Sequence, residues 1–299
     1  MAKLISADLT NNKLCILEYT TTDGQMLSFK EDAFDAKIVS HTYTDIGKVI
    51  FDKPITRIGE RAFYNCTSLK EFKGKFAADG GRCLIIDGVL NAFAIGCGVI
   101  QYAIPNSVTT IGSSAFSCCK SLTSVTIPDS VTTIGEWAFY WCSSLTSVTI
   151  PDSVTTIGYG AFYNCDSLTS VTIGNSVTTI GKDAFAHCES LTSVTIGDSV
   201  TTIGDSAFAD CYSLTSVTIP DSVTTIGWWA FMYCESLTSV TIPDSVTTIR
   251  EDAFNYCSSL KTVYCKPTTP PTGGNEMFYN NASDRKIYVP ASDDDSIIN

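Results

Sequence analysis

The stretch "SLTSVTIPDSVTTIGEWAFYWC", residues 121–142, decides the fold, because the chain repeats it with few changes almost to its end. The next copy, "SLTSVTIPDSVTTIGYGAFYNC", occupies residues 144–165 and starts 23 residues later. A repeat of this length is typical of solenoids, in which each unit buries its apolar side only against its neighbours. The repetition therefore predicts one elongated unit for most of the 299 residues, and not two globular domains.

Each copy is expected to contain a strand, a turn, a shorter strand, a second turn and one helical turn. Residues 124–127, Ser-Val-Thr-Ile, alternate polar and β-branched apolar side chains, the pattern of a strand with one buried face. Pro-Asp-Ser at residues 128–130 turns the chain, residues 131–134 form a second extended piece, and Gly135 permits another bend. The spacing Ala-Phe-x-x-Cys in residues 138–142 places three apolar groups on one side of a helical turn.

Stacked copies can bury an interior that a single copy leaves exposed. We expect the strands of successive copies to pair in parallel at about 4.8 Å, so that each apolar position lies on its equivalent in the next coil. The expectation on which this architecture depends is a continuous interior file of rings, formed by Phe116, Phe139, Phe162 and Phe185.

The thirteen cysteines follow the repeat and do not have the pattern of a disulfide framework. Their odd number and their 23-residue spacing favour a column of small buried thiols. The chain contains no Cys-x-x-Cys pair, so a zinc site is not expected. Cys66 heads an earlier, irregular copy. The state of Cys15, Cys83, Cys97, Cys118 and Cys265, which fall outside the period, is left open. The periodic thiols are those of Cys119, Cys142, Cys165, Cys188, Cys211, Cys234 and Cys257.

The copy from Leu122 to Cys142 resembles a leucine-rich repeat of the bacterial 23-residue type, that of the BspA-like surface proteins. The L-x-x-V-x-I-P core followed by V-x-x-I-G-x-x-A-F-x-x-C is the recognisable form, and it runs from about residue 50 to residue 265. The resemblance implies an α/β repeat solenoid: a right-handed superhelix with a parallel β-sheet on one face and short strands and helical turns on the others. It also implies a bacterial, often cell-surface, protein that is used for attachment and is not an enzyme.

The repeat is irregular at both ends, which divides the chain into three predicted parts. Residues 1–48 carry strand-like segments and are expected to form an N-terminal β-rich cap. Residues 49–265 form the solenoid, with an inserted β-hairpin at about residues 70–103, where two apolar runs flank an Asp-Gly pair. Residues 266–299 form a C-terminal cap that ends the array, since an open last coil would expose its core.

Five columns around the Ala-Phe-x-x-Cys group vary among the seven copies from 113 to 259, and they hold all four tryptophans of the chain. We expect these columns on the outer side of the helical turn, where exposed aromatic rings favour contact with a partner. Two other interpretations stay open: neutral drift of surface positions, and rings that lie flat and seal the edge. The candidate ligand-binding residues are Trp137, Tyr140, Trp141, Tyr159, Tyr163, Tyr212, Trp228, Trp229, Tyr233 and Tyr256.

A second candidate binding surface consists of the outward-facing columns that stay the same in every copy. Ser124, Thr126 and their equivalents form hydroxyl ladders on the predicted sheet face, and we favour a stabilising role for these cross-strand contacts. A monotonous surface encodes little specificity, although a repetitive glycan would match it. A column of Asp residues follows the proline, but Asn takes the same slot twice and Asp is ordinary in turns, so no metal site is expected. This column is Asn106, Asp129, Asp152, Asn175, Asp198, Asp221 and Asp244.

Composition and motifs argue against several classes of function. A net charge of −12 without a Lys/Arg-rich run disfavours nucleic acid as a partner, and the lack of an 18-residue apolar stretch predicts no membrane span. The chain has only two histidines, His41 and His187, and no nucleophile-elbow, HExxH or phosphate-loop motif. We therefore expect no enzyme activity, no catalytic residue and no cofactor.

The sequence predicts a non-catalytic recognition or adhesion protein that binds a protein or glycan ligand, for example one from a host. The alternative is a structural spacer in a larger surface assembly. The resemblance implies a cell-surface or secreted location. Residues 1–13 lack the apolar region of a signal peptide, so a cytoplasmic location is the alternative. The ligand and the oligomeric state are left open.

Overall fold

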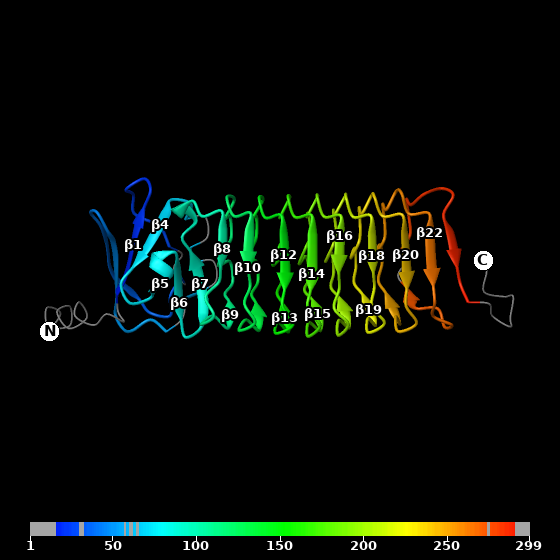
Figure 1. Ribbon diagram of the computed structural model, residues 1–299, viewed down its shortest axis with the longest axis horizontal. Helices are drawn as coiled ribbons and strands as arrows, with labels where there is room; N and C mark the ends of the chain where they lie inside the picture. The colour runs from blue at the N-terminus through cyan, green and yellow to red at the C-terminus, as the bar shows by residue number, and fades with distance from the viewer. Residues whose placement is uncertain are drawn as a thin grey trace.

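The computed structural model describes residues 16–29, 33–56, 58–59, 62–63, 66–273 and 276–290. In this part of the chain, successive coils stack along a rod, with a small antiparallel sheet at the N-terminal end (Figure 1). The molecule is a β-solenoid of stacked parallel strands, and helix among the described residues is limited to the short 3₁₀ turns η2 (Asp79–Gly81) and η3 (Ile95–Cys97).

Two long sheets run along the rod, and each coil contributes one strand to each of them. In the described residues the first sheet has nine strands, in the spatial order β24-β22-β20-β18-β16-β14-β12-β10-β8. These strands are β8 (Gln101–Ala103), β10 (Ser124–Thr126), β12 (Ser147–Ile150), β14 (Ser170–Ile173), β16 (Ser193–Thr195), β18 (Ser216–Thr218), β20 (Ser239–Ile242), β22 (Thr262–Cys265) and β24 (Lys286–Tyr288).

The second sheet has eleven described strands and begins with antiparallel pairs before it becomes parallel. Its strands are β5 (Ala77–Ala78), β6 (Cys83–Ile86), β7 (Val89–Phe93), β9 (Thr110–Ile111), β11 (Thr133–Ile134), β13 (Thr156–Ile157), β15 (Thr179–Ile180), β17 (Thr202–Ile203), β19 (Thr225–Ile226), β21 (Thr248–Ile249) and β23 (Thr272–Gly273).

Pairing between coils joins equivalent residues of the repeat. Strands β12 and β14 pair in parallel from Ser147 with Ser170 to Ile150 with Ile173, which is an offset of one full repeat. The inward valine and isoleucine of each strand are buried, while the serine and threonine between them face outward. The half-buried strand that the sequence predicts is therefore confirmed, and its register follows from the 23-residue period.

The phenylalanine of each repeat lies in the interior, directly on the phenylalanine of the next coil. Ring centroids of Phe116, Phe139, Phe162 and Phe185 are 4.9, 4.9 and 5.1 Å apart, and the rings are parallel within 7°. The file continues through Phe208, Phe231 and Phe254, and all seven rings have no exposed surface. The predicted interior file is confirmed.

The periodic cysteines form a second buried column, and they are free thiols. Each thiol from Cys142 to Cys257 donates a hydrogen bond to the phenylalanine carbonyl of the preceding coil, as Cys142 Sγ does to Phe116 O at 3.1 Å. Burial raises the pKa of these thiols, for Cys257 to about 12, so they stay protonated and can donate. Cys83, Cys97, Cys118 and Cys265 are likewise not in disulfide bonds, and Cys15 lies outside the described residues.

The expected helical turn, and with it the α/β class, is wrong. Residues 135–142 form tandem β-turns, in which Ala138 N–H donates to Gly135 O and Tyr140 N–H to Trp137 O. The amides between them donate to carbonyl oxygens of the next coil: Trp137 N–H donates to Tyr159 O at 2.8 Å, and Phe139 N–H to Ala161 O at 2.7 Å. A helix would need every amide for bonds within its own segment, whereas here half of them join neighbouring coils.

The N-terminal end has its own sheet and its own small core. Strands β1 (Ile16–Thr21), β2 (Ile38–Tyr43), β3 (Gly47–Phe51) and β4 (Leu69–Lys73) form an antiparallel sheet in the order β2-β3-β1-β4. Strands β6 and β7 pair antiparallel across Asp87 and Gly88, whose φ angles of 49° and 77° suit a tight hairpin turn. Because β7 also pairs in parallel with β9, this hairpin continues the second sheet.

Replacing Phe185 by alanine should remove one ring from the middle of the interior file. The ring is fully buried between Phe162 and Phe208, so we expect a loss of about 3–5 kcal/mol in the free energy of unfolding. Urea denaturation followed by circular dichroism measures this loss. As a control, Thr178→Ala at an exposed position of the same coil should change it by less than about 0.5 kcal/mol. A small effect of Phe185→Ala would contradict the packing described above.

Candidate recognition surface

The variable columns lie on the tandem turns, and two of these columns have left-handed backbone conformations. Trp137 and Trp141 have φ angles of 55° and 59°, and the same two positions are left-handed in all seven coils. Residues other than glycine, asparagine and aspartate adopt this conformation at a cost of about 1 kcal/mol or more. The amides of both residues are bonded to the next coil, so the turns hold these side chains at fixed positions on the edge of the rod.

Five of the ten predicted site residues form an N-terminal aromatic cluster: Trp137, Tyr140, Trp141, Tyr159 and Tyr163. The Trp137 ring is the centre of the cluster, with ring centroids at 4.4 Å from Tyr159, 5.2 Å from Tyr140 and 5.7 Å from Tyr163. All but Trp141 are half-buried. Most of the aromatic surface in this cluster is therefore covered, and Trp141, which is 37% exposed, is the exception.

Gly160 explains how the Trp137 ring can lie flat across the next coil. A Cβ atom at Gly160 would lie 2.4 Å from the Trp137 ring, which is too close for any side chain. Gly160 occupies the same column as Trp137, one coil further along, and has a φ angle of 57°. The tryptophan and the glycine are thus a matched pair between coils, which supports the sealing role for this cluster.

Four other predicted residues form a C-terminal aromatic cluster: Trp228, Trp229, Tyr233 and Tyr256. Here Trp228, Trp229 and Tyr256 expose 39%, 43% and 41% of their surface. The Tyr233 and Tyr256 rings stack at 4.6 Å, and Trp229 Nε1–H donates a hydrogen bond to Asp252 Oδ2 at 3.2 Å. This cluster is held in place by its neighbours but is not covered by them.

Arg250 completes the C-terminal aromatic cluster. Its guanidinium carbon lies 4.1 Å from the centroid of the Trp228 ring, a cation–π contact. Arg250 stands where the six preceding coils have glycine, from Gly112 to Gly227. The side chain was not among the predicted site residues, although its replacement of an otherwise constant glycine is a signal that the sequence contains.

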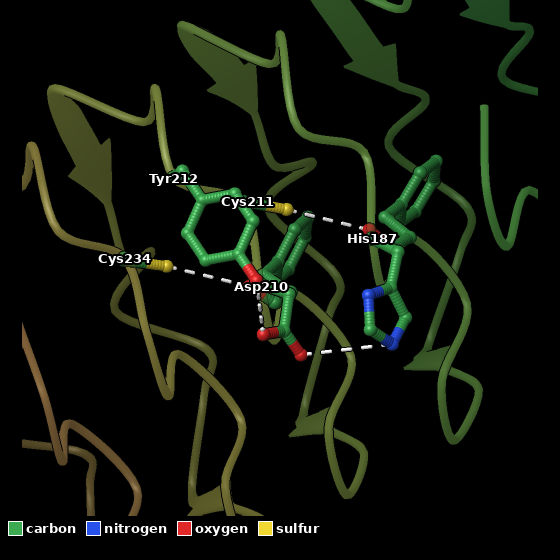
Figure 2. A network of polar contacts seen from close by, with 7 residues as sticks. His187, Asp210, Cys211, Tyr212 and Cys234 are labelled. Atoms are coloured by element: carbon green, nitrogen blue, oxygen red, sulfur yellow. Dashed lines mark hydrogen bonds and ion pairs between the residues drawn. The ribbon is translucent and has the colours of Figure 1, made fainter. Parts of the chain in front are cut away.

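The tenth predicted residue, Tyr212, belongs to a polar network between the two clusters (Figure 2). The Tyr212 hydroxyl donates to Asp210 Oδ1 at 2.9 Å, and His187 Nε2 lies 3.6 Å from Asp210 Oδ2. Partial burial and the bond to Asp210 raise the pKa of Tyr212 to about 12. Figure 2 also shows the Cys211 and Cys234 thiols beside this network, where they donate to phenylalanine carbonyls. Tyr212 thus packs against its own network, which meets the N-terminal aromatic cluster where the His187 ring lies 4.9 Å from that of Tyr163.

The sequence matches the profile of the BspA type leucine-rich repeat region in six copies, over residues 36–76, 90–212 and 178–295. The chain belongs to the BspA-type leucine-rich repeat family. None of the curated proteins matches it. In the part of this BspA-type chain that the structure describes, no helix has the length and apolarity to cross a bilayer, and no group of three or more His, Cys, Asp or Glu side chains is placed to hold a metal.

Solved structures of leucine-rich repeat proteins are similar to this BspA-type chain. A protein from Eubacterium ventriosum shares 29% identity with a TM-score of 0.57, over 68% of this chain and 50% of that one, so this chain spans half the length of that protein. A protein from Bacteroides ovatus, at 24% identity and a TM-score of 0.50, covers 86% of this chain and 70% of its own and supports the fold alone. A leucine rich cell surface protein from Faecalibacterium prausnitzii has 29% identity and a TM-score of 0.43, over 80% of this chain and 78% of that one.

Tryptophan replacement in the two clusters of this BspA-type chain should change the free energy of unfolding by different amounts. Trp137→Ala should lower the free energy of unfolding by about 1–3 kcal/mol, because it uncovers Gly160 and removes three ring contacts. Trp229→Ala is the matched control, since both residues occupy the same left-handed column, and it should change this free energy by less than about 0.5 kcal/mol. Chemical denaturation of both variants tests this, and equal losses would show that the clusters do not differ in burial.

Proposed function

We propose that this BspA-type solenoid is a non-catalytic recognition module that binds a protein partner through its C-terminal aromatic cluster. The observation that carries the proposal is the exposure of Trp228, Trp229 and Tyr256, in contrast to the self-covered N-terminal cluster. Tryptophan, tyrosine and arginine are the residues that most often dominate binding energy at protein interfaces. Arg250 lies on the Trp228 ring, and Tyr256 lies on the next tandem turn, so all three residue types occur on one edge of the rod.

The rigidity of the turns supports a binding role. Trp229 N–H donates to Glu251 O at 3.3 Å and Tyr233 N–H to Asn255 O at 3.0 Å, so the backbone under the cluster is bonded to the next coil. The stacked Tyr233 and Tyr256 rings and the Arg250 contact on Trp228 restrict the side chains as well. A surface that is already ordered loses little conformational entropy when a partner binds.

The charge of the solenoid points to a basic partner. Residues 113–259 contain fourteen Asp and Glu but only three Lys and Arg, at positions 120, 182 and 250. The exposed Glu235 and Glu251 lie in the same coils as the cluster. A partner surface rich in Lys and Arg would be attracted to this edge and guided to it. We therefore place the partner among basic proteins and not among nucleic acids.

The N-terminal aromatic cluster favours a structural role for the first part of the same edge. Its rings cover one another and Gly160, which is what the edge-seal interpretation requires. We propose that the first coils form a rigid spacer that positions the binding cluster. A cell-surface or secreted location would suit this arrangement, and labelling of intact cells with an antibody against the chain would test it.

Binding to an array of purified extracellular proteins that span a range of net charge tests the proposal. The wild-type chain should bind basic members, and Trp228→Ala/Trp229→Ala/Tyr256→Ala should lose at least tenfold in affinity without a change in melting temperature. The matched control, Glu136→Ala/Ser206→Ala/Asn164→Ala, changes the same three columns in other coils and also places alanine at two left-handed positions. Its affinity should equal that of the wild type.

Salt provides an independent check on the charge argument. Raising the ionic strength from about 0.1 M to 1 M shortens the Debye length from about 10 Å to 3 Å, so the association rate should fall. Binding only to acidic proteins or only to glycans, equal losses in both triple variants, or an association rate that is insensitive to salt would contradict the proposal.

A further inference from the structure

A groove lies along the other turn of the coil, away from the aromatic clusters. It has a volume of about 610 Å³ and follows the C-terminal ends of β12, β14 and β16, from the turn at Asp129 to the turn at Asp198. Four successive coils contribute to it. At about 4.8 Å per coil, this gives the groove a length of about 14 Å.

The groove lies where the repeat loses its proline. Coils before and after carry Ile-Pro-Asp-Ser, whereas residues 173–176 and 196–199 read Ile-Gly-Asn-Ser and Ile-Gly-Asp-Ser. Two neighbouring coils therefore lack the pyrrolidine ring. A Cβ atom at Gly174 would lie 2.5 Å from Pro151 O, and one at Gly197 would lie 2.3 Å from Gly174 O. The close approach of these backbones allows no side chain at either position, so the groove stays open.

Hydrogen-bonding side chains line this groove at regular intervals. The exposed hydroxyl-bearing residues Thr149, Thr172 and Thr195 come from successive strands of the first sheet, at the same register position. Beside them lie the exposed side chains of Asp152, Asn175 and Asp198 in successive turns.

Two of the turn side chains are already oriented by the backbone. Asn175 N–H donates to Asp152 Oδ1 at 2.7 Å, and Asp198 N–H donates to Asn175 Oδ1 at 3.2 Å. These bonds engage one oxygen of each side chain. The second carboxylate oxygen of Asp152 and the amide nitrogen of Asn175 take no part in them, which leaves an acceptor and a donor held at fixed positions.

We propose that this groove binds a neutral, linear glycan. Hydroxyl groups of a sugar need both donors and acceptors, which the threonine hydroxyls, the Asn175 amide and the Asp carboxylates supply together. The same groups recur at each coil, so a ligand that itself repeats can use all of them. The groove lining includes three Asp and no Lys or Arg, which disfavours acidic glycans.

Threonine-to-valine pairs test the proposal, because valine keeps the shape and the strand propensity but removes the hydroxyl. The probes are linear gluco-, manno- and xylo-oligosaccharides of six sugars, presented on an array and then titrated by calorimetry. At least one should bind the wild-type chain, and Thr172→Val/Thr195→Val should weaken it by about tenfold, as expected for two lost hydrogen bonds. The matched control, Thr218→Val/Thr241→Val, changes the same slot outside the groove and should bind as the wild type does.

Two results would overturn the assignment: no oligosaccharide of the panel binds, or both valine pairs lose affinity equally. Melting curves of both pairs confirm that each variant is folded before its affinity is measured. The triple variant of the C-terminal aromatic cluster should keep full oligosaccharide affinity. Failure of the glycan assignment is therefore distinguishable from failure of the protein-binding proposal.

Discussion

The structure depends on the contact between identical apolar side chains of successive coils. A single coil has no interior of its own, because its strands, turns and phenylalanine form only one layer. When Phe162 lies on Phe139 at 4.9 Å and beneath Phe185 at 5.1 Å, each ring is removed from water by its own equivalents. The backbone bonds of both sheets and of the tandem turns all join one coil to the next, so one repeat length satisfies side chains and main chain together.

That constraint separates the part of the repeat that stays constant from the part that can change. Side chains inside the coil must match their neighbours in volume, whereas the variable columns only have to fit the turn. The turn still imposes a condition between neighbours, since Trp137 can lie flat only because Gly160 follows it one coil later. Trp229 has no such glycine after it, because Asp252 takes that slot and accepts its hydrogen bond. The partner in the next coil therefore decides whether a tryptophan is covered or exposed.

The sequence was sufficient to predict the stacked coils, the register, the phenylalanine file and the buried thiols, since all of these follow from the period and from the apolar positions. The helical turn was wrong because Ala-Phe-x-x-Cys spacing fits tandem β-turns as well as a helix. The frequent Gly, Asn, Asp and His in the two left-handed columns, such as Gly160, Asn164 and His187, were the available signal. The division of the candidate residues into a covered and an exposed cluster depends on contacts between coils, which composition alone does not give.

Removal of one whole coil tests the central claim most directly. Deleting residues 190–212, one period, should place Phe231 on Phe185 and leave a shorter solenoid that still unfolds cooperatively in urea. Its m-value should be lower than that of the full chain, because less surface is exposed on unfolding. Deleting residues 190–200, about half a period, should abolish the cooperative transition, since every later column would then face the wrong neighbour. If both deletions unfold alike, like-on-like stacking of coils is not what holds this protein together.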